Sequence, residues 1–390
     1  MQPMCRWEMR SLFVLALLLA TSGQQCGMPP AATHDPGDDL PSGDPCRKPG
    51  VICTVVGTGM SVFDGDGRDA LATSLYYPLD VEFDALGRPL IVDWNNLRVR
   101  RLNDDGMVET IIGLDYEAAP TPGGLATQTP LHHASDIELT ADGRLYLAGN
   151  HAPVVFYVGT DNRVVLAAGG DNFGYAGDGG PALEAELTAP FGVMPTPDGG
   201  LYISDAEAHV VRHVDPSGII TTAAGTGERG YSGDGRPGNE AALNGPTRLR
   251  LDDAGNLYIC DTENHVIRRL ARDGIITTFA GTGALGYSGD DGPAGAAQLH
   301  TPYDVRFSPA GDLYVADTGN NVIRRITPDG IITTVVGTGG PGFAGDGGDA
   351  RACQLDRPSS VTFDPEGAMW ISDTFNQRVR RIADFLSVYD

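Results

Sequence analysis

The sequence predicts an all-β, six-bladed propeller with four antiparallel strands in each blade. Two observations carry this prediction. A 56-residue repeat occurs six times without a gap, and the strand missing from the last copy stands at the other end of the chain. The copies open at Gly57, Gly113, Gly169, Gly225, Gly281 and Gly337. A repeat of this length, rich in short strands, indicates one supersecondary unit that is arranged radially.

Each copy contains four short runs rich in Val, Ile, Tyr and Thr, separated by Gly, Asn and Asp. In the copy that opens at Gly281, strands are expected at Tyr303 to Ser308, Asp312 to Asp317, Asn321 to Thr327 and Ile331 to Gly337. A Ser-Pro-Ala-Gly turn joins the first two strands and a Pro-Asp-Gly turn joins the last two. This alternation of strand and turn is the pattern of a propeller blade.

The two ends of the repeat region predict how the ring closes. The sixth copy lacks the Ile-Ile-Thr-Thr-Val-Val-Gly strand, whereas residues 51–57 read Val-Ile-Cys-Thr-Val-Val-Gly. We expect this N-terminal strand to complete the last blade. Closure of this kind leaves no blade with an unpaired outer edge on which other chains could aggregate.

The best-preserved repeat resembles the NHL-repeat family. The resemblance rests on Leu-Tyr-Val-Ala-Asp-Thr at 313–318, Val-Ile-Arg-Arg-Ile at 322–326, and the Asp-Gly turn with Ile-Ile-Thr-Thr-Val-Val-Gly that follows. The glycine-rich segment from residue 281 resembles the long version in teneurin-type NHL propellers and in many exported bacterial ones. The resemblance to the NHL-repeat family covers residues 51–390 and implies the propeller fold. It does not fix a function, because the fold hosts binding modules, sensors and a few lyases.

The first 50 residues are expected to target and tether the propeller. Arg6 and Arg10 precede an apolar run that is too short to span a bilayer, so residues 1–25 are interpreted as an export signal. Cys26 stands where a lipoprotein would be cleaved and acylated, and ordinary cleavage near Ala20 is the alternative. Residues 26–50 are rich in Pro, Gly and Asp and predict a flexible tether. We therefore expect a periplasmic, outer-membrane-anchored or secreted protein.

The cysteine positions suggest one disulfide. Cys53 aligns with Thr, Glu and Val in the other copies, which indicates an exposed site, and Cys46 lies seven residues before it. Because exported proteins can hold disulfides, we expect a Cys46–Cys53 bridge, with Cys46–Cys353 as the alternative. Cys260 aligns with Ser or Ala and is expected to be a buried free thiol.

Composition and charge exclude some partners. The formal net charge is −24 and the sequence pI is about 4.5. A negative field of this size argues against nucleic acid and anionic membrane as partners, so membrane contact is expected only through an acylated Cys26. We expect a monomer that binds a protein or a small polar ligand at a propeller face.

The recurring polar motifs are explained by the fold. The aspartates of the Gly-Asp loops (Asp66, Asp178, Asp234, Asp290 and Asp346) are expected to bond neighbouring turn amides, because one carboxylate per loop is too few for calcium. The Asp and Asn of the Ala-Asp-Thr-x-Asn hairpins are expected to be structural.

Neither a catalytic nor a metal site is expected. His132 and His300 share one repeat position and face each other across the ring, but two histidines on opposite rims do not make a zinc site. The sequence has no Gly-x-Ser-x-Gly, CxxC or HExxH motif and no nucleophile beside an obvious base. No cofactor is therefore expected.

The second repeat departs most from the others. Gly149 replaces the hairpin aspartate, and Phe156-Tyr157 replaces the Arg-Arg pair. Two interpretations are open: neutral drift, or an exposed aromatic patch for a partner.

The innermost strand of each copy is expected to place polar side chains in the central channel. Opposite blades would then put Asp80 across from Arg248, Glu82 across from Arg250, and Glu138 across from Arg306, whereas Asp136 and Asp304 would be mismatched. These residues, with His132 and His300 at the rim, are the candidate binding residues. The charges either neutralise one another or form a polarised mouth for a small polar or zwitterionic ligand.

Two functions follow from these expectations. The first is a non-enzymatic extracytoplasmic binding or scaffolding module. The alternative is a lyase or lactonase-like hydrolase with its site at the channel mouth, although the rim residues (Tyr76, His132, Thr188, Asn244, His300 and Asp356) do not form a clear ligand set.

Overall fold

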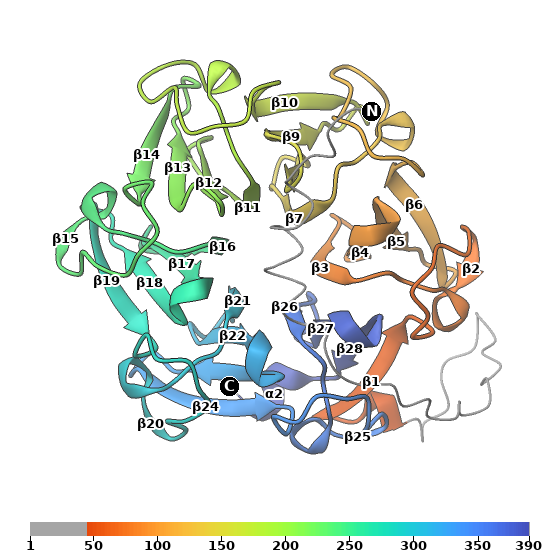
Figure 1. Ribbon diagram of the computed structural model, residues 1–390. Helices are drawn as coiled ribbons and strands as arrows, with labels where there is room; N and C mark the ends of the chain where they lie inside the picture. Colours follow the sequence, from red (N-terminus) through yellow and green to blue (C-terminus); the bar gives the residue numbers. More distant parts are fainter. Residues whose placement is uncertain (1–44, 390) are drawn as a thin grey trace, which may run out of the picture. The chain divides into compact units, whose positions relative to one another are not determined.

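The computed structural model describes residues 45–389, and these residues form a six-bladed β-propeller, as predicted. Figure 1 shows the blades arranged around a central axis. The expected export signal, the acylation candidate Cys26 and residues 26–44 of the expected tether lie outside the described residues. Blades are numbered 1 to 6 in the order of their innermost strands.

The four main strands of a blade occupy equivalent positions in every repeat. The innermost strands are β3 (Pro78–Phe83), β7 (Ala134–Leu139), β11 (Pro190–Pro195), β16 (Pro246–Leu251), β21 (Pro302–Phe307) and β26 (Pro358–Phe363). The second strands are β4 (Pro89–Asp93), β8 (Leu145–Gly149), β12 (Leu201–Asp205), β17 (Leu257–Asp261), β22 (Leu313–Asp317) and β27 (Met369–Asp373). The third strands are β5 (Arg98–Leu102), β9 (Val154–Val158), β13 (Val210–Val214), β18 (Val266–Leu270), β23 (Val322–Ile326) and β28 (Arg378–Ile382). The outer strands are β6 (Met107–Gly113), β10 (Val164–Gly169), β14 (Ile220–Ala224), β19 (Ile275–Ala280), β24 (Ile331–Val336) and β1 (Val51–Val56).

Four blades carry a short fifth strand at the outer edge. These strands are β2 (Arg68–Asp69), β15 (Arg236–Pro237), β20 (Gly292–Pro293) and β25 (Gly348–Asp349). In every blade a 3₁₀ turn follows this position: η2 (Ala70–Ala72), η4 (Ala126–Gln128), η5 (Ala182–Glu184), η6 (Gly238–Glu240), η8 (Ala294–Ala296) and η10 (Ala350–Ala352). The sequence did not predict the fifth strand, because two residues are too short for a period-two pattern to be recognised.

Each blade has two ends, which form the two faces of the propeller. At one end, the hairpins between the second and third strands contain η3 (Trp94–Asn96), η7 (Thr262–Asn264), η9 (Thr318–Asn320) and η11 (Thr374–Asn376) in four blades. We call this end the hairpin face. The opposite end carries the turns between the first and second strands and is called the turn face.

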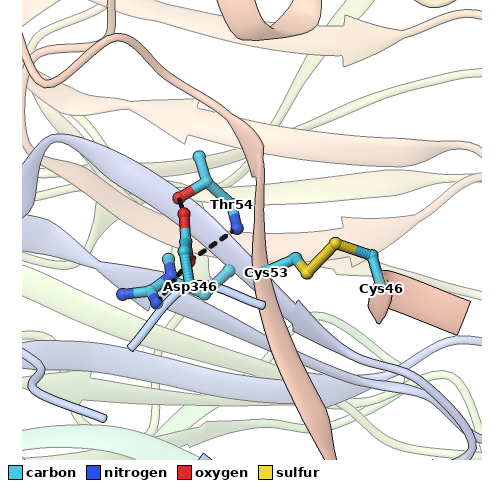
Figure 2. The surroundings of a disulfide bond; sticks show 5 residues. Cys46, Cys53, Thr54 and Asp346 are labelled. Carbon is cyan, nitrogen blue, oxygen red and sulfur yellow. Dashed lines mark hydrogen bonds and ion pairs between the residues drawn. A yellow bond between two sulfur atoms is a disulfide. The ribbon is translucent and has the colours of Figure 1, made fainter. Parts of the chain in front are cut away.

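The N-terminal strand closes the ring. β1 pairs antiparallel with β28, with Ile52 opposite Ile382 and Thr54 opposite Arg380, and it also pairs with β25. Figure 2 shows the Cys46–Cys53 disulfide beside this strand, where Thr54 donates backbone and side-chain hydrogen bonds of 3.0 and 2.7 Å to Asp346. The disulfide links β1 to η1 (Pro45–Arg47), so this end of the expected tether is fixed to the propeller.

The core consists of apolar clusters between adjacent blades. The cluster between blades 1 and 2 contains Val92, Ile112, Ile137, Leu147 and Phe156, all at most 2% exposed. A corresponding cluster joins blades 6 and 1, where Trp370 packs edge-on against Phe83 with ring centroids 5.5 Å apart. Ring closure therefore buries the same kind of interface as any other pair of blades.

Burial in this core narrows the two interpretations of blade 2. Phe156 is 2% exposed and Tyr157 packs on Tyr146, with ring centroids 5.1 Å apart. Phe156 is therefore excluded from an exposed aromatic patch, whereas Tyr157 is partly exposed. Phe156 faces the core because successive side chains of the third strand point to opposite faces of the blade, and both faces are buried. Cys260 and Cys353 are also fully buried, and both are free thiols.

Five blades share a network centred on one fully buried arginine, which we call the arginine clamp. These arginines are Arg100, Arg212, Arg268, Arg324 and Arg380, each 0% exposed. Each guanidinium lies 2.5–3.1 Å from the aspartate of its own Gly-Asp loop: Asp66, Asp178, Asp234, Asp290 and Asp346. The expectation that these aspartates only bond turn amides is thus corrected, because a guanidinium in an apolar blade requires a carboxylate partner.

The clamp also holds further parts of the blade. In four blades the same arginine contacts the hairpin aspartate at 3.0–3.4 Å, in the pairs Arg100–Asp93, Arg268–Asp261, Arg324–Asp317 and Arg380–Asp373. The ring of a loop aromatic residue, such as Tyr287 in blade 5, lies about 5 Å from the guanidinium. The hairpin aspartate in turn accepts a backbone N–H from the segment before the inner strand, as Asp317 does from His300 at 2.8 Å. The hairpin Asp and Asn are structural in the described blades, as expected.

The ring closure generates a first prediction. Deletion of Val51–Val56 should leave β28 as an unpaired edge and expose the apolar residues it covers, so the variant should aggregate or unfold without a cooperative transition. Cys46→Ser is the matched control, because it keeps the strand and removes only a bridge of sequence separation 7. It should fold and lose about 2–3 kcal/mol of unfolding free energy in denaturant titrations. A deletion variant with the parent melting temperature would contradict the closure.

Candidate functional site

The candidate site is the central channel, where the inner strands place two layers of polar side chains. A register irregularity after the first residue of each inner strand, such as that between Pro78 and Asp80, sets which residues face the axis. The first layer contains Asp80, Asp136, Arg248 and Asp304, and the second layer contains Glu82, Glu138, Arg250 and Arg306. By strand direction the first layer lies nearer the hairpin face and the second nearer the turn face.

Arg248 holds the first layer together. Its guanidinium is 1% exposed, lies 2.6 Å from Asp80 Oδ2 and forms a second ion pair with Asp136. It also donates hydrogen bonds of 2.6 and 3.3 Å to the carbonyl oxygens of Ser135 and Leu79. One side chain from blade 4 therefore contacts blades 1 and 2 across the channel.

The second layer is joined in the same way. Arg250 forms an ion pair with Glu138, and Arg306 lies 2.6 Å from Glu82 Oε2 and 3.7 Å from Glu138 Oε1. Arg306 Nη2 also donates a 2.7 Å hydrogen bond to Thr362 Oγ1. Four charged side chains from four blades thus interlock directly, and the Thr362 hydroxyl adds a fifth blade.

These contacts correct part of the expected pairing. Asp80 meets Arg248 and Glu138 meets Arg306, but Glu82 pairs with Arg306 rather than with Arg250. Asp136, expected to be mismatched, shares Arg248 with Asp80. The pairs differ from the expected ones because an arginine is long enough to reach the neighbours of the opposite blade.

The first-layer aspartates also link neighbouring blades through backbone hydrogen bonds. Asp80 accepts the N–H of Ile137 at 3.1 Å, and Asp136 accepts that of Val193 at 2.7 Å. Asp304 accepts the N–H of Val361 at 3.0 Å. Each carboxylate therefore joins its own blade to the next one, in addition to any arginine that it contacts.

Burial changes the proton affinity of these groups. Burial raises the pKa of the Glu138 carboxyl above its ordinary value, although Arg250 and Arg306 oppose the rise. Burial also raises the pKa of Asp304. For Arg306, burial favours proton loss, but the carboxylates of Glu82 and Glu138 outweigh it and raise the pKa, so the guanidinium stays charged.

The channel is more accessible from the turn face than from the hairpin face. Glu82 and Arg306 have side chains that are 15% and 17% exposed, whereas the first-layer ion pairs are at most 8% exposed. On the hairpin side, Phe191 and Tyr303 lie edge to face with centroids 5.2 Å apart, and both are buried. The channel is therefore filled by mutually paired charges and covered by an aromatic pair.

Comparison with known proteins identifies the repeat. A sequence model of the NHL repeat matches residues 243–270, which run from the start of blade 4 to the end of its third strand. The chain therefore carries an NHL repeat in blade 4 of a six-bladed propeller. Its fold and its repeat signature therefore agree.

The NHL propeller is similar in sequence to teneurins along most of its length. Mouse teneurin-3 is 29% identical over 376 residues, and Drosophila melanogaster teneurin-m is 26% identical over 379 residues. Each alignment covers 86% of this chain and 13–14% of the teneurin. The chain thus spans about one seventh of the length of these relatives.

Solved structures with the same fold are more distant in sequence. A Bacteroides thetaiotaomicron protein of unknown function is 18% identical with a TM-score of 0.64, over 85% of this chain and 75% of that one. An auxiliary nutrient binding protein from the same organism is 19% identical with a TM-score of 0.61, over 85% and 76% of the two chains. At this level of identity the likeness shows the fold alone. Among the described residues of the NHL propeller, no helix has the length and apolarity that a bilayer-spanning helix needs.

The two candidate rim histidines lie in different surroundings. His300 lies near His265, with ring centroids 5.9 Å apart, whereas His132 lies near His133 and His151. Burial lowers the pKa of His133 to about 3 and that of His151 to about 4, so both imidazoles are neutral at neutral pH. His151 was missed from the sequence because it lies on the hairpin, outside the repeat position that His132 and His300 share.

Sequence reasoning also missed a group of aromatic residues on the hairpin face, which we call the aromatic belt: Tyr76, Tyr77, Trp94 and Phe375. Tyr77 lies 5.0 Å from both Tyr76 and Phe375 and 6.5 Å from Trp94, measured between ring centroids. Each residue is partly exposed. The sequence does set Trp94 apart, because its equivalents in blades 3 to 6 are only Ala or Thr (Ala206, Thr262, Thr318 and Thr374).

The second layer of the channel generates a second prediction. Arg250→Met should destabilise the NHL propeller by about 3–5 kcal/mol, because it removes one of the two arginines that pair with the buried Glu138 carboxylate. In the Arg250→Met, Glu138→Gln double variant the loss should be smaller than the sum of the single losses, with a coupling energy of about 1–3 kcal/mol in denaturant titrations.

Asp80→Asn supplies the control for this cycle, since Asp80 pairs with Arg248 instead. The stability losses of Asp80→Asn and Arg250→Met should be more nearly additive than those of Glu138→Gln and Arg250→Met. Coupling indistinguishable from zero between Arg250 and Glu138 would contradict the pairing.

Proposed function

We propose that this NHL propeller is a non-enzymatic binding or scaffolding module that works outside the cytoplasm and captures a polypeptide at the aromatic belt. The observation that carries the proposal is the belt itself, which gathers Tyr76, Tyr77, Trp94 and Phe375 from blades 1 and 6 on one face. All four side chains are partly exposed, and aromatic groups on a rigid scaffold are among the side chains that anchor protein partners.

Comparison of equivalent positions supports a role beyond folding. Tyr77 has a positive φ of 55°, and blade 4 places Gly245 at the same position with φ of 61°. Trp94 is matched by Thr in three other blades. Those blades fold without large aromatic side chains here, so the belt is not a requirement of the propeller.

The filled channel also supports a binding surface over an internal catalytic site. The carboxylates and guanidiniums there are partnered with one another, so a zwitterionic ligand would have to replace ion pairs that are already formed. No specific observation favours the lyase or hydrolase alternative.

Two observations support work outside the cytoplasm. The sequence begins with the pattern of an export signal, and the Cys46–Cys53 disulfide is of a kind that persists in oxidising compartments. The fold is shared with a protein described as an auxiliary nutrient binding protein, which is compatible with a binding role.

The test is capture by the full chain from the extracytoplasmic fraction of its own cells, with retained proteins quantified by mass spectrometry. The double variant Tyr77→Gly, Trp94→Thr copies residues found at these positions in other blades and should fold. A partner that uses the belt should be depleted by at least about tenfold, because loss of one hot-spot aromatic residue costs about 2 kcal/mol or more.

The control places two changes on the hairpin face in blades 4 and 5, away from the belt. Thr301→Gly and Glu263→Ala alter the equivalents of Tyr77 and Phe375. This control should retain what the parent retains. If the belt variant and the parent retain the same proteins in equal amounts, the proposed binding surface is wrong.

A further inference from the structure

Three histidines of blade 2 converge on the hairpin face. His132 and His133 directly precede β7, and His151 lies in the turn between β8 and β9. Each residue can offer one ring nitrogen such that all three nitrogens lie within 4.8 Å of one another. This grouping includes neither His300 nor any other residue from the opposite side of the ring.

The nitrogens of this cluster lack hydrogen-bond partners. His132 Nδ1, His133 Nδ1 and His151 Nε2 are buried and make no hydrogen bond with any described residue. His133 as a whole is only 7% exposed. Buried polar atoms are almost always satisfied in folded proteins, so three such atoms in one place require an explanation.

Stacking explains the position of the rings but leaves their nitrogens unexplained. The His133 ring lies 4.4 Å from the ring of Trp94, and the His151 ring lies 5.9 Å from it. These contacts use the faces and edges of the rings. A ligand that accepts lone pairs from the nitrogens would account for all three.

A carboxylate stands beside the cluster. Glu117 Oε1 is 3.6 Å from His133 Nδ1, and Glu117 Oε2 is 3.8 Å from His132 Nε2. Both separations are too long for hydrogen bonds, and the Glu117 side chain is 49% exposed. The carboxylate is therefore near enough to move onto a bound ion, and the site is open to solvent on this side.

The cluster occupies the place of an interaction that blade 2 has lost. In every other blade the hairpin aspartate accepts the backbone N–H of the residue equivalent to His132, at 2.7–2.8 Å. Gly149 stands at that position in blade 2 and has no side chain to do so. Three imidazoles thus gather where the segment before the inner strand and the hairpin are otherwise joined by Asp.

Blade 2 also lacks a link that joins most neighbouring blades at the rim. Elsewhere the residue that ends the hairpin turn accepts a backbone N–H from the next blade, as His209 does from Gly245 and His265 from Thr301, both at 3.1 Å. The equivalents on either side of blade 2 are Leu97 and Pro153, whose side chains cannot accept a hydrogen bond. The rim of blade 2 therefore has fewer polar ties than the others.

We propose that His132, His133 and His151 bind one zinc ion, with Glu117 or water as the fourth ligand. Imidazole nitrogens at about 2.0–2.1 Å in a tetrahedral set are a preferred environment of Zn²⁺, and small rotations of the three side chains would bring the nitrogens to that spacing. The ion joins the segment before β7 to the β8–β9 turn, and so replaces the missing aspartate. The sequence predicted no metal site, because His151 lies outside the repeat position that His132 and His300 share.

The experiment uses the full chain, stripped of metal with a chelator and titrated with ZnCl₂ in competition with a chromophoric chelator. We expect one zinc per chain with a Kd at or below about 1 µM, and a visible absorption band of tetrahedral geometry when Co²⁺ replaces Zn²⁺. His151→Asn copies Asn95 of blade 1 and should weaken zinc binding by on the order of 100-fold or more, since it removes a direct ligand.

The matched control is His300→Ala, which removes the histidine at the position equivalent to His132 and should leave the zinc affinity unchanged. Should His151→Asn fail to fold in the absence of metal, His132→Asn takes its place, because blade 4 carries Asn244 there. Absence of tight zinc binding by the parent, or equal affinity of parent and cluster variants, would overturn the proposal. Either result would leave the aromatic belt untouched, since that surface is tested by different residues.

Discussion

The fold depends on one arginine buried inside each of five blades. A guanidinium with no exposed surface is costly to desolvate, and the chain meets that cost with a loop aspartate, an aromatic ring and, in four blades, a hairpin aspartate. Because these partners come from the glycine-rich loop and the hairpin, one side chain fixes the position of both relative to the sheet. The long loop of the repeat is thus held by charge pairing more than by its own apolar contacts, which are few in a segment so rich in glycine.

Blade 2 shows what happens when this arrangement is lost. Phe156 replaces the arginine and fills the core, so the apolar interface with blade 1 is kept while the polar ties to loop and hairpin disappear. The channel partly compensates, because Asp80 and Asp136 link blade 2 to both neighbours and Arg248 reaches it from blade 4. The histidine cluster lies in this less constrained blade, and Trp94 of the aromatic belt in blade 1 stacks against it. The cluster therefore stands where the repeat has diverged, whereas the belt comes from blades that keep the clamp.

Most of the fold could be predicted from the sequence, because repetition averages out local ambiguity. Strand order, blade number and closure by residues 51–57 all follow from a period of 56 residues without knowledge of any contact. The candidate site was harder to predict from the sequence. The channel residues were found by alternation along the inner strand, yet Glu82 was assigned to the wrong arginine because alternation says nothing about how far a guanidinium reaches. The group of His132, His133 and His151 crosses two repeat positions, so comparison of single positions could not reveal it.

The measurement that tests this account most directly is the unfolding free energy of two adjacent variants in blade 4. Arg268 is fully buried with Asp234 at 2.7 Å and Asp261 at 3.4 Å, whereas its neighbour Arg269 is partly exposed. Arg268→Met should lose about 3–5 kcal/mol in denaturant titrations, because two carboxylates lose their partner. Arg269→Met removes the same charge from the same strand and should lose no more than about 1 kcal/mol. Equal losses, or a stable Arg268→Met protein, would contradict the claim that the buried arginines hold the blades together.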